Sequence, residues 1–187
     1  MIVSLLERLT PGNVCVDGDV ILGKVRGCQN GRLTALGECY IEQHALGYVR
    51  SERRDFAGAE ILYRRALAVV ETAYGAEDPR IAGPLGNLAG LDRKWERRDD
   101  AAALYLRLAG VFERILGTND FHVAMTLEHV ADAHAAQGQY AEAEEFYGRV
   151  LAILAPWLGS DHALVQEVLA ERAHARRQLE LSRGKKG

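Results

Sequence analysis

The sequence predicts an all-α fold: a right-handed helical-repeat solenoid of three helix pairs plus a C-terminal capping helix. Three observations support it. Tyrosine recurs every 42 residues, at Tyr63, Tyr105 and Tyr147. Alanine keeps the same step four residues before each tyrosine, and glycine keeps it twelve residues after. Self-similarity at a fixed period is typical of solenoids, in which each repeat buries its apolar face against its neighbours.

Composition and charge narrow the class of protein. The chain is 48% hydrophobic and 26% charged, as in ordinary soluble domains. A net charge of −3 gives no electrostatic footprint for nucleic acid. Residues 1–9 have no basic leader and only a short apolar run, so we expect no membrane segment and a cytoplasmic location. Cys15, Cys28 and Cys39 form no CxxC spacing and are expected to be reduced thiols.

Residues 1–32 do not fit the repeat and are treated as a separate segment preceding the repeat domain at 33–187. The apolar stretches 14–16 and 20–22 flank an Asp17-Gly18 pair, a pattern that indicates a β-hairpin. The alternative is a poorly ordered leader, or the remnant of a longer upstream region. Both readings stay open, since an isolated hairpin is only marginally stable.

Helix boundaries follow from capping residues. We expect helices at about 33–53, 55–74, 79–94, 101–116, 120–137, 140–155 and 162–181. Glycines at the end of each repeat are expected to stop the second helices. Pro156 should end or bend the helix that contains it. Polar residues are expected to cap the other starts, in order Asp78 before Pro79, Asp99 or Asp100, Asn119 or Asp120, and Ser160-Asp161.

The second repeat departs most from the pattern. Its first helix, 79–94, contains Pro84 and the glycines Gly83, Gly86 and Gly90. Since interior glycine costs about 1 kcal/mol and interior proline about 3 kcal/mol relative to alanine, this helix should be the weakest or most kinked. The glycine stripe is a bare binding surface, a sign of a degenerate repeat, or a set of small residues that allow neighbouring helices to pack closely. Its internal turn must also close without the glycine that the third repeat has at position 138.

Gly138, Tyr140, Ala143 and Tyr147, preceded by a helix with Leu127, resemble the tetratricopeptide repeat. The step of 42 residues exceeds that family's usual length of about 34. It is similar to the kinesin-light-chain type. The resemblance covers residues 33–181 and implies that the first helix of each pair lines a concave surface that binds other proteins.

Steps of three and four along the exposed face of these first helices give the candidate partner-binding residues. Glu128 and Asp132 make the centre of this face acidic, which suits a peptide with basic character. Asn87 is the one asparagine kept from the family's Leu-Asn-Asn-Leu-Ala segment. The full candidate set is His44, Tyr48, Asn87, Arg93, Met125, Glu128, Asp132, His174 and Arg177.

Catalytic and metal-binding patterns are not found in the sequence. His129 and His134 are five residues apart, which points them in different directions on a helix, whereas HExxH needs a step of four. There is no GxSxG elbow and no phosphate-binding loop. We therefore expect no catalytic residues, no metal and no cofactor.

The leading hypothesis is a non-catalytic module that binds a peptide or helix of a partner protein on the concave face. The alternative is a self-associating structural or scaffold element of a larger assembly, because three repeats are near the minimum for independent stability. An all-helical enzyme is the third and weakest hypothesis, and it would require a deep pocket with converging titratable groups.

Overall fold

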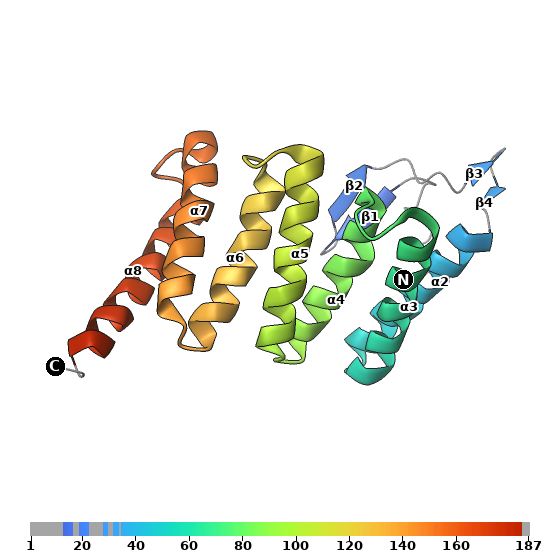
Figure 1. Ribbon diagram of the computed structural model, residues 1–187, viewed down its shortest axis with the longest axis horizontal. Helices are drawn as coiled ribbons and strands as arrows, with labels where there is room; N and C mark the ends of the chain where they lie inside the picture. Colours follow the sequence, from blue (N-terminus) through green and yellow to red (C-terminus); the bar gives the residue numbers. More distant parts are fainter. Residues whose placement is uncertain (1–12, 17–18, 23–27, 30–31, 34, 185–187) are drawn as a thin grey trace. The chain divides into compact units, whose positions relative to one another are not determined.

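The computed structural model describes residues 13–16, 19–22, 28–29, 32–33 and 35–184 (Figure 1). Contacts divide the chain into two compact units, residues 1–91 and 92–187. Helices account for residues 35–184 apart from short connections, and the predicted all-α helical-repeat fold is confirmed.

The first unit begins with two short antiparallel strand pairs. β1 (Asn13–Val16) pairs with β2 (Asp19–Leu22), and β3 (Cys28–Gln29) pairs with β4 (Arg32–Leu33). In the first pair Val16 lies opposite Asp19, so two residues, 17 and 18, connect the strands. These two residues lie outside the described part of the chain, as do residues 1–12.

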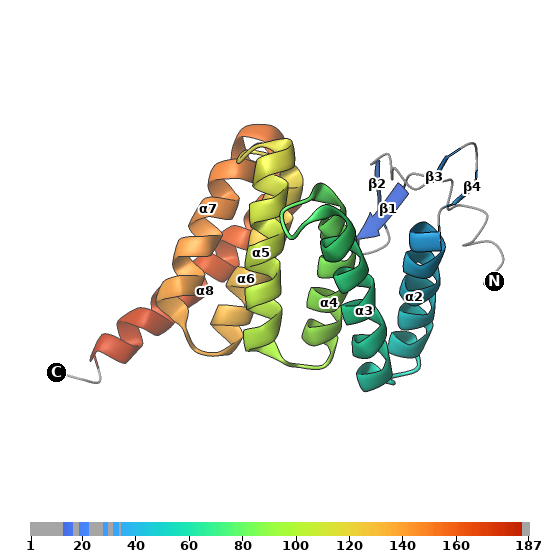
Figure 2. The same ribbon diagram turned by 45° about the vertical axis from the view of Figure 1, so that its right-hand side comes forward.

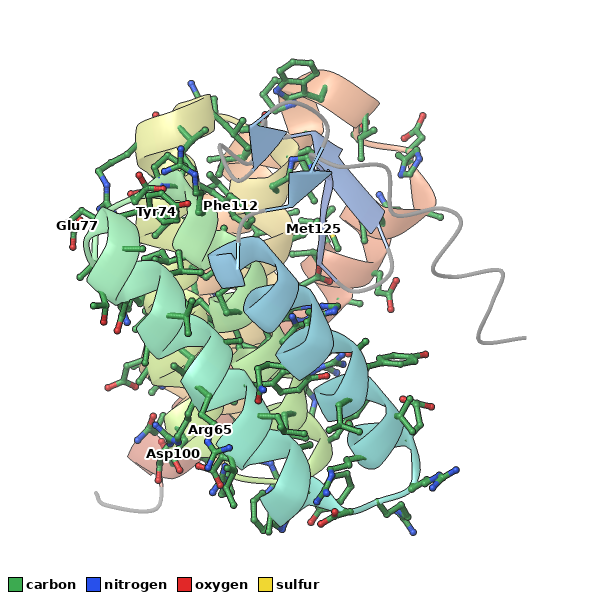
Figure 3. All side chains as sticks on the ribbon, turned by 90° about the vertical axis from the view of Figure 1, so that its right-hand side faces the viewer. Arg65, Tyr74, Glu77, Asp100, Phe112 and Met125 are labelled. Atoms are coloured by element: carbon green, nitrogen blue, oxygen red, sulfur yellow. The ribbon has the colours of Figure 1, made fainter. Side chains whose placement is uncertain are left out.

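Helices form the rest of the first unit. α2 (Ala35–Glu52) packs against α3 (Phe56–Tyr74), which is followed by a short 3-10 helix η1 (Pro79–Ile81) and by α4 (Ala82–Lys94). In Figure 3, Arg65 lies along α3, and Tyr74 and Glu77 mark its far end. The Arg80 guanidinium stacks on the Tyr74 ring at 4.0 Å and pairs with Asp78, which fixes the connection between α3 and α4.

The second unit holds the last residues of α4 and four helices, α5 (Arg98–Leu116), α6 (Phe121–Ala136), α7 (Tyr140–Leu158) and α8 (Ala163–Gly184). α6 packs against α5 and α7, and α7 packs against α8 (Figure 2). The repeated tyrosines Tyr105 and Tyr147 are each 2% exposed, and the alanines four residues earlier are as deeply buried. The repeated positions are therefore core positions.

Each connection repeats at the 42-residue step. Gly75, Gly117 and Gly159 have φ of 96°, 91° and 82°, and each donates its N–H to a carbonyl four residues earlier. Inside the pairs, the left-handed turn position is Arg54, Glu96 and Gly138, with φ of 62°, 62° and 76°. The repeat thus imposes the same backbone turn even where the residue is not glycine.

The first helices start alike as well. The side chain of Asp78 accepts a hydrogen bond from the backbone N–H of Arg80, and Asp120 accepts one from His122. At the next step His162 replaces aspartate, and its Nδ1 accepts from the N–H of Leu164 at 3.3 Å. The predicted caps Asp78 and Asp120 are confirmed, whereas His162 rather than Ser160-Asp161 caps α8.

Three further sequence expectations were wrong in detail. The N-cap of α5 is Arg97, so Asp99 and Asp100, one of which was expected to cap the helix, lie in its first turn. Pro84 was expected to lie in the interior of its helix, but it is the third residue of α4. The N–H groups of the first turn have no partner within the helix, so the proline breaks no hydrogen bond there. The helix does not end at Pro156 as one of the two expected outcomes had it, because α7 continues through the proline to Leu158 and has Gly159 as its C-cap.

Candidate partner-binding face

The most distinctive polar group in the second unit is formed by Glu128 and Asp132, one turn apart on α6. Glu128 is half-buried and Asp132 is exposed. The hydroxyl of Tyr147 on α7, itself 2% exposed, donates to Oδ1 of Asp132 at 2.7 Å. Burial and this hydrogen bond to Asp132 raise the pKa of Tyr147. Asp132 is therefore held in place by a rigid neighbour.

Glu128 is the group whose ionisation is most disturbed on this face. Its Oε2 is buried and has no hydrogen-bond partner among the described residues. Burial, followed by the charges of Asp132 and Glu167, raises the pKa of Glu128 from 4.5 to about 7. Glu167 comes from α8, so two carboxylates, Asp132 on α6 and Glu167 on α8, act on the Glu128 carboxyl.

The other predicted residues of this unit lie on α4, α6 and α8. Met125 is half-buried, one turn before Glu128 on α6 (Figure 3). His174 is exposed, and its ring lies edge-on to Tyr140 at 6.5 Å between centroids. Arg93 and Arg177 are exposed near the ends of α4 and α8. Glu167 was missed, although the 42-residue step maps it onto Met125.

In the first unit the structure joins two candidates that sequence reasoning treated separately. His44 of α2 and Asn87 of α4 share a side-chain hydrogen bond, and the His44 ring lies 6.3 Å from the Tyr63 ring. Burial lowers the pKa of His44, and the hydrogen bond to Asn87 offsets part of that effect. Nδ2 of Asn87 is buried without a partner in the described part of the chain. Tyr48 is 48% exposed.

Comparison with protein families identifies the repeat. Residues 43–80 and 123–164 match the family model described as Tetratricopeptide repeat. The chain contains tetratricopeptide repeats. Domains built from this repeat generally mediate protein–protein interactions, and their fold is typically non-catalytic. A comparison with curated proteins finds no match.

Solved structures confirm the expected likeness to the kinesin-light-chain type at the level of fold. BtubC (BKLC) from P. vanneervenii has a TM-score of 0.69 and 16% identity, with 80% of this chain and 59% of BtubC covered. Nearly identical TPR-like repeats of a kinesin light chain from Podosopora anserina give 0.62 and 22%, with coverage of 75% and 66%. This tetratricopeptide repeat chain thus spans less than two thirds of either protein.

A third similar structure comes from another kind of protein. The N-terminal domain of stress-induced protein-1 (STI-1) from C. elegans has a TM-score of 0.56 and 16% identity. The alignment covers 74% of this chain and 98% of that domain. At such identities the likeness concerns the arrangement of helices in the tetratricopeptide repeats.

The glycine stripe of α4 does not form an open surface in this tetratricopeptide repeat protein. Gly83, Gly86 and Gly90 are all buried. The interpretation of these glycines as a bare, exposed helix face is therefore wrong. Burial favours small residues that permit close packing at this position of the repeat.

The histidines of α6 contact aromatic rings of different helices. His129 lies 4.7 Å from the Tyr105 ring of α5, whereas His134 stacks on Phe146 of α7 at 5.5 Å. Among the described residues no group of three or more His, Cys, Asp or Glu side chains could hold a metal ion. None of the helices in that same part of the chain is both long and apolar enough to cross a membrane.

Proposed function

We propose that this protein is a non-catalytic interaction module whose first helices bind a peptide or helix of a partner protein on their concave face. Within the second unit, Glu128, Asp132 and Glu167 would receive a lysine or arginine side chain of that partner. The observation that carries the proposal is the buried, unpartnered Oε2 of Glu128 beside two further carboxylates.

The physical argument is one of unsatisfied charge. A buried acceptor without a donor costs about 1–3 kcal/mol, and nearby carboxylates add repulsion. An incoming ammonium or guanidinium group would donate to Oε2 and neutralise the repulsion among the three carboxylates. It would also displace the proton that the raised pKa of Glu128 retains near neutral pH. A basic side chain should therefore bind more tightly here than at an isolated surface glutamate.

Other predicted residues would supply the remaining contacts within each unit. Met125 supplies apolar surface beside the acidic group, and the exposed His174 and Arg93 would meet polar parts of the partner. In the first unit, the unpartnered Nδ2 of Asn87 would donate to a backbone carbonyl of a bound segment. Tyr48, about half exposed, offers an aromatic surface on the same unit.

A peptide display selection on the full chain tests the proposal. Selected peptides should be enriched in lysine or arginine at one position, and a Glu128→Gln/Asp132→Asn variant should lose that enrichment. The matched control is Glu142→Gln/Glu145→Gln, which removes the same charge from exposed positions of α7. The proposal fails if no basic preference emerges, or if the control variant loses the preference equally.

We also propose that the protein acts in the cytoplasm and that its partner is a protein rather than a nucleic acid. The competing proposal is self-association into a scaffold. Light scattering over a range of concentrations distinguishes the two, because partner binding on the concave face requires no second copy of the chain.

A further inference from the structure

Helix α8 begins a fourth helix pair. Its cap, His162, lies one 42-residue step after Asp120, the cap of α6. Val165, Val168 and Ala175 are each 1% exposed, and they match buried positions of α6 at the same step. One side of α8 thus packs against α7 as α6 packs against α5.

The other side of α8 has no equivalent cover. On α6, Leu127 is 1% exposed and Ala131 is 0% exposed. One step later, Leu169 is 40% exposed and Ala173 is also exposed. Both views show the C-terminal end of α8 clear of the other helices of its unit (Figures 1 and 2). We define the outer face of α8 as Leu169, Ala173 and Arg177, which follow one another at four-residue steps.

Helix pairs within the chain show what this kind of face accepts. Gly47 of α2 holds the position of Ala173, three steps earlier. It is buried, and a Cβ added there would lie 2.6 Å from Cε1 of Tyr63 on α3. The second helix of that pair therefore lays a tyrosine ring on the small residue of the first. The face of α8 continues this interface, with Ala173 as the small residue.

We propose that the outer face of α8 binds an amphipathic helix supplied by a partner protein, with the apolar pattern of a repeat's own second helix. In α7 that pattern is Ala143, Tyr147 and Val150, each at most 2% exposed. The partner helix carries a small residue, an aromatic residue four positions later and an aliphatic residue three positions after that. This contact uses none of the three acidic residues, and Arg177, which the spacing predicted for the concave face, is assigned to it instead.

Charge adds a second requirement. Arg172 and Arg176 are both bound to Glu144 of α7, at 2.8 and 2.6 Å. Arg177 is exposed and replaces Ala135 of α6 at the equivalent position. A carboxylate of the partner helix at this level would pair with Arg177. The favoured partner is therefore a helix with one acidic residue beside its apolar stripe.

Fluorescence anisotropy with the full chain tests this inference. The probe is a labelled synthetic peptide with the sequence of residues 139–159, the chain's own α7 with its flanking residues. We expect saturable binding with a Kd below about 1 mM. Leu169→Glu should weaken it at least tenfold, whereas Leu106→Glu, on α5 and equally 40% exposed, should change it less than twofold.

Controls separate this result from misfolding and from the concave face. Circular dichroism should show both variants as helical as the wild type, and Leu169→Glu should leave binding of basic peptides unchanged. Absence of saturable probe binding overturns the inference, as does equal weakening by both variants. A Leu169-dependent dimer in light scattering also overturns it, since a second copy of the chain would then occupy the face.

Discussion

Asp92 is completely buried, and its carboxylate forms an ion pair with Arg97, whose side chain is 28% exposed. Nε of Arg97 donates to Oδ1 at 2.9 Å, and the guanidinium also lies over the Trp95 ring. The same two positions of the first repeat hold Arg50 and Asp55, with the charges exchanged and both side chains about half exposed. A single repeat position therefore carries a buried pair in one copy and a surface pair in another.

This difference predicts unequal stability effects. Arg97→Met removes an ion-pair partner from a completely buried carboxylate and should cost about 3 kcal/mol of unfolding free energy. Arg50→Met removes a solvent-screened pair and should cost less than about 1 kcal/mol. Urea unfolding followed by circular dichroism measures both. Equal losses would show that burial of Asp92 does not set the strength of the pair.

The left-handed turn residues predict stabilising substitutions. Arg54 and Glu96 have φ of 62°, a conformation that costs an L-residue roughly 1 kcal/mol relative to glycine. Arg54→Gly and Glu96→Gly should each raise the unfolding free energy by about 0.5–1 kcal/mol. Gly138→Ala, at the equivalent position, should lower it by about 1 kcal/mol. A loss of stability in both glycine variants would contradict the assignment of strain to these turns.

Two helical glycines predict opposite outcomes for the same change. Gly47→Ala places a Cβ 2.6 Å from the buried Tyr63 ring and should cost about 1–3 kcal/mol. A Cβ added at Gly110 would lie 3.8 Å from Nη1 of Arg114, an ordinary van der Waals contact, so Gly110→Ala should stabilise α5 by about 0.5–1 kcal/mol. Thermal unfolding of both variants tests this prediction. If both melting temperatures shifted in the same direction, the contact with Tyr63 would not determine the effect of Gly47→Ala.

The raised pKa of Glu128 predicts a pH dependence of stability. Because its folded pKa of about 7 lies above the ordinary value of 4.5, the folded state binds this proton more tightly than the unfolded chain. The resulting stabilisation is complete below about pH 4.5 and is lost as the pH rises to about 7. Glu128→Gln removes this dependence and should be more stable than wild type at pH 8.

The comparison between variants isolates Glu128 from other groups. His44, whose pKa is lowered by burial, contributes with the opposite sign and is present in both proteins. Melting temperatures at pH 5.5 and pH 8 should therefore differ between wild type and Glu128→Gln mainly through this one carboxyl. Parallel curves for the two proteins would count against its raised pKa.

The sequence predicted those helix ends and caps that depend on the type of residue recurring at the 42-residue step. Gly75 and Gly117 end their helices because glycine alone adopts φ near 90° without strain, and Asp120 caps because its side chain reaches a free N–H. Arg97 could not be foreseen as an N-cap. Its position is set by the backbone turn, in which its N–H bonds to the carbonyl of Asp92 at 2.9 Å.

The candidate face was only partly readable for a similar reason. Glu128 and Asp132 share a helix, so spacing alone placed them on one side. Glu167 belongs to another helix, and its influence on Glu128 depends on how α8 packs against α7. The hydrogen bond between His44 and Asn87 likewise joins two helices, and no spacing within either helix predicts it.

The central claim is that Glu128 receives a basic side chain. Its most direct test is a carbon-13 NMR titration of the Glu128 carboxyl in the full chain, alone and saturated with a lysine-containing peptide from the display selection. The account predicts a pKa of about 7 alone and a fall toward the ordinary value with peptide bound. A pKa that stays unchanged on saturation would contradict it.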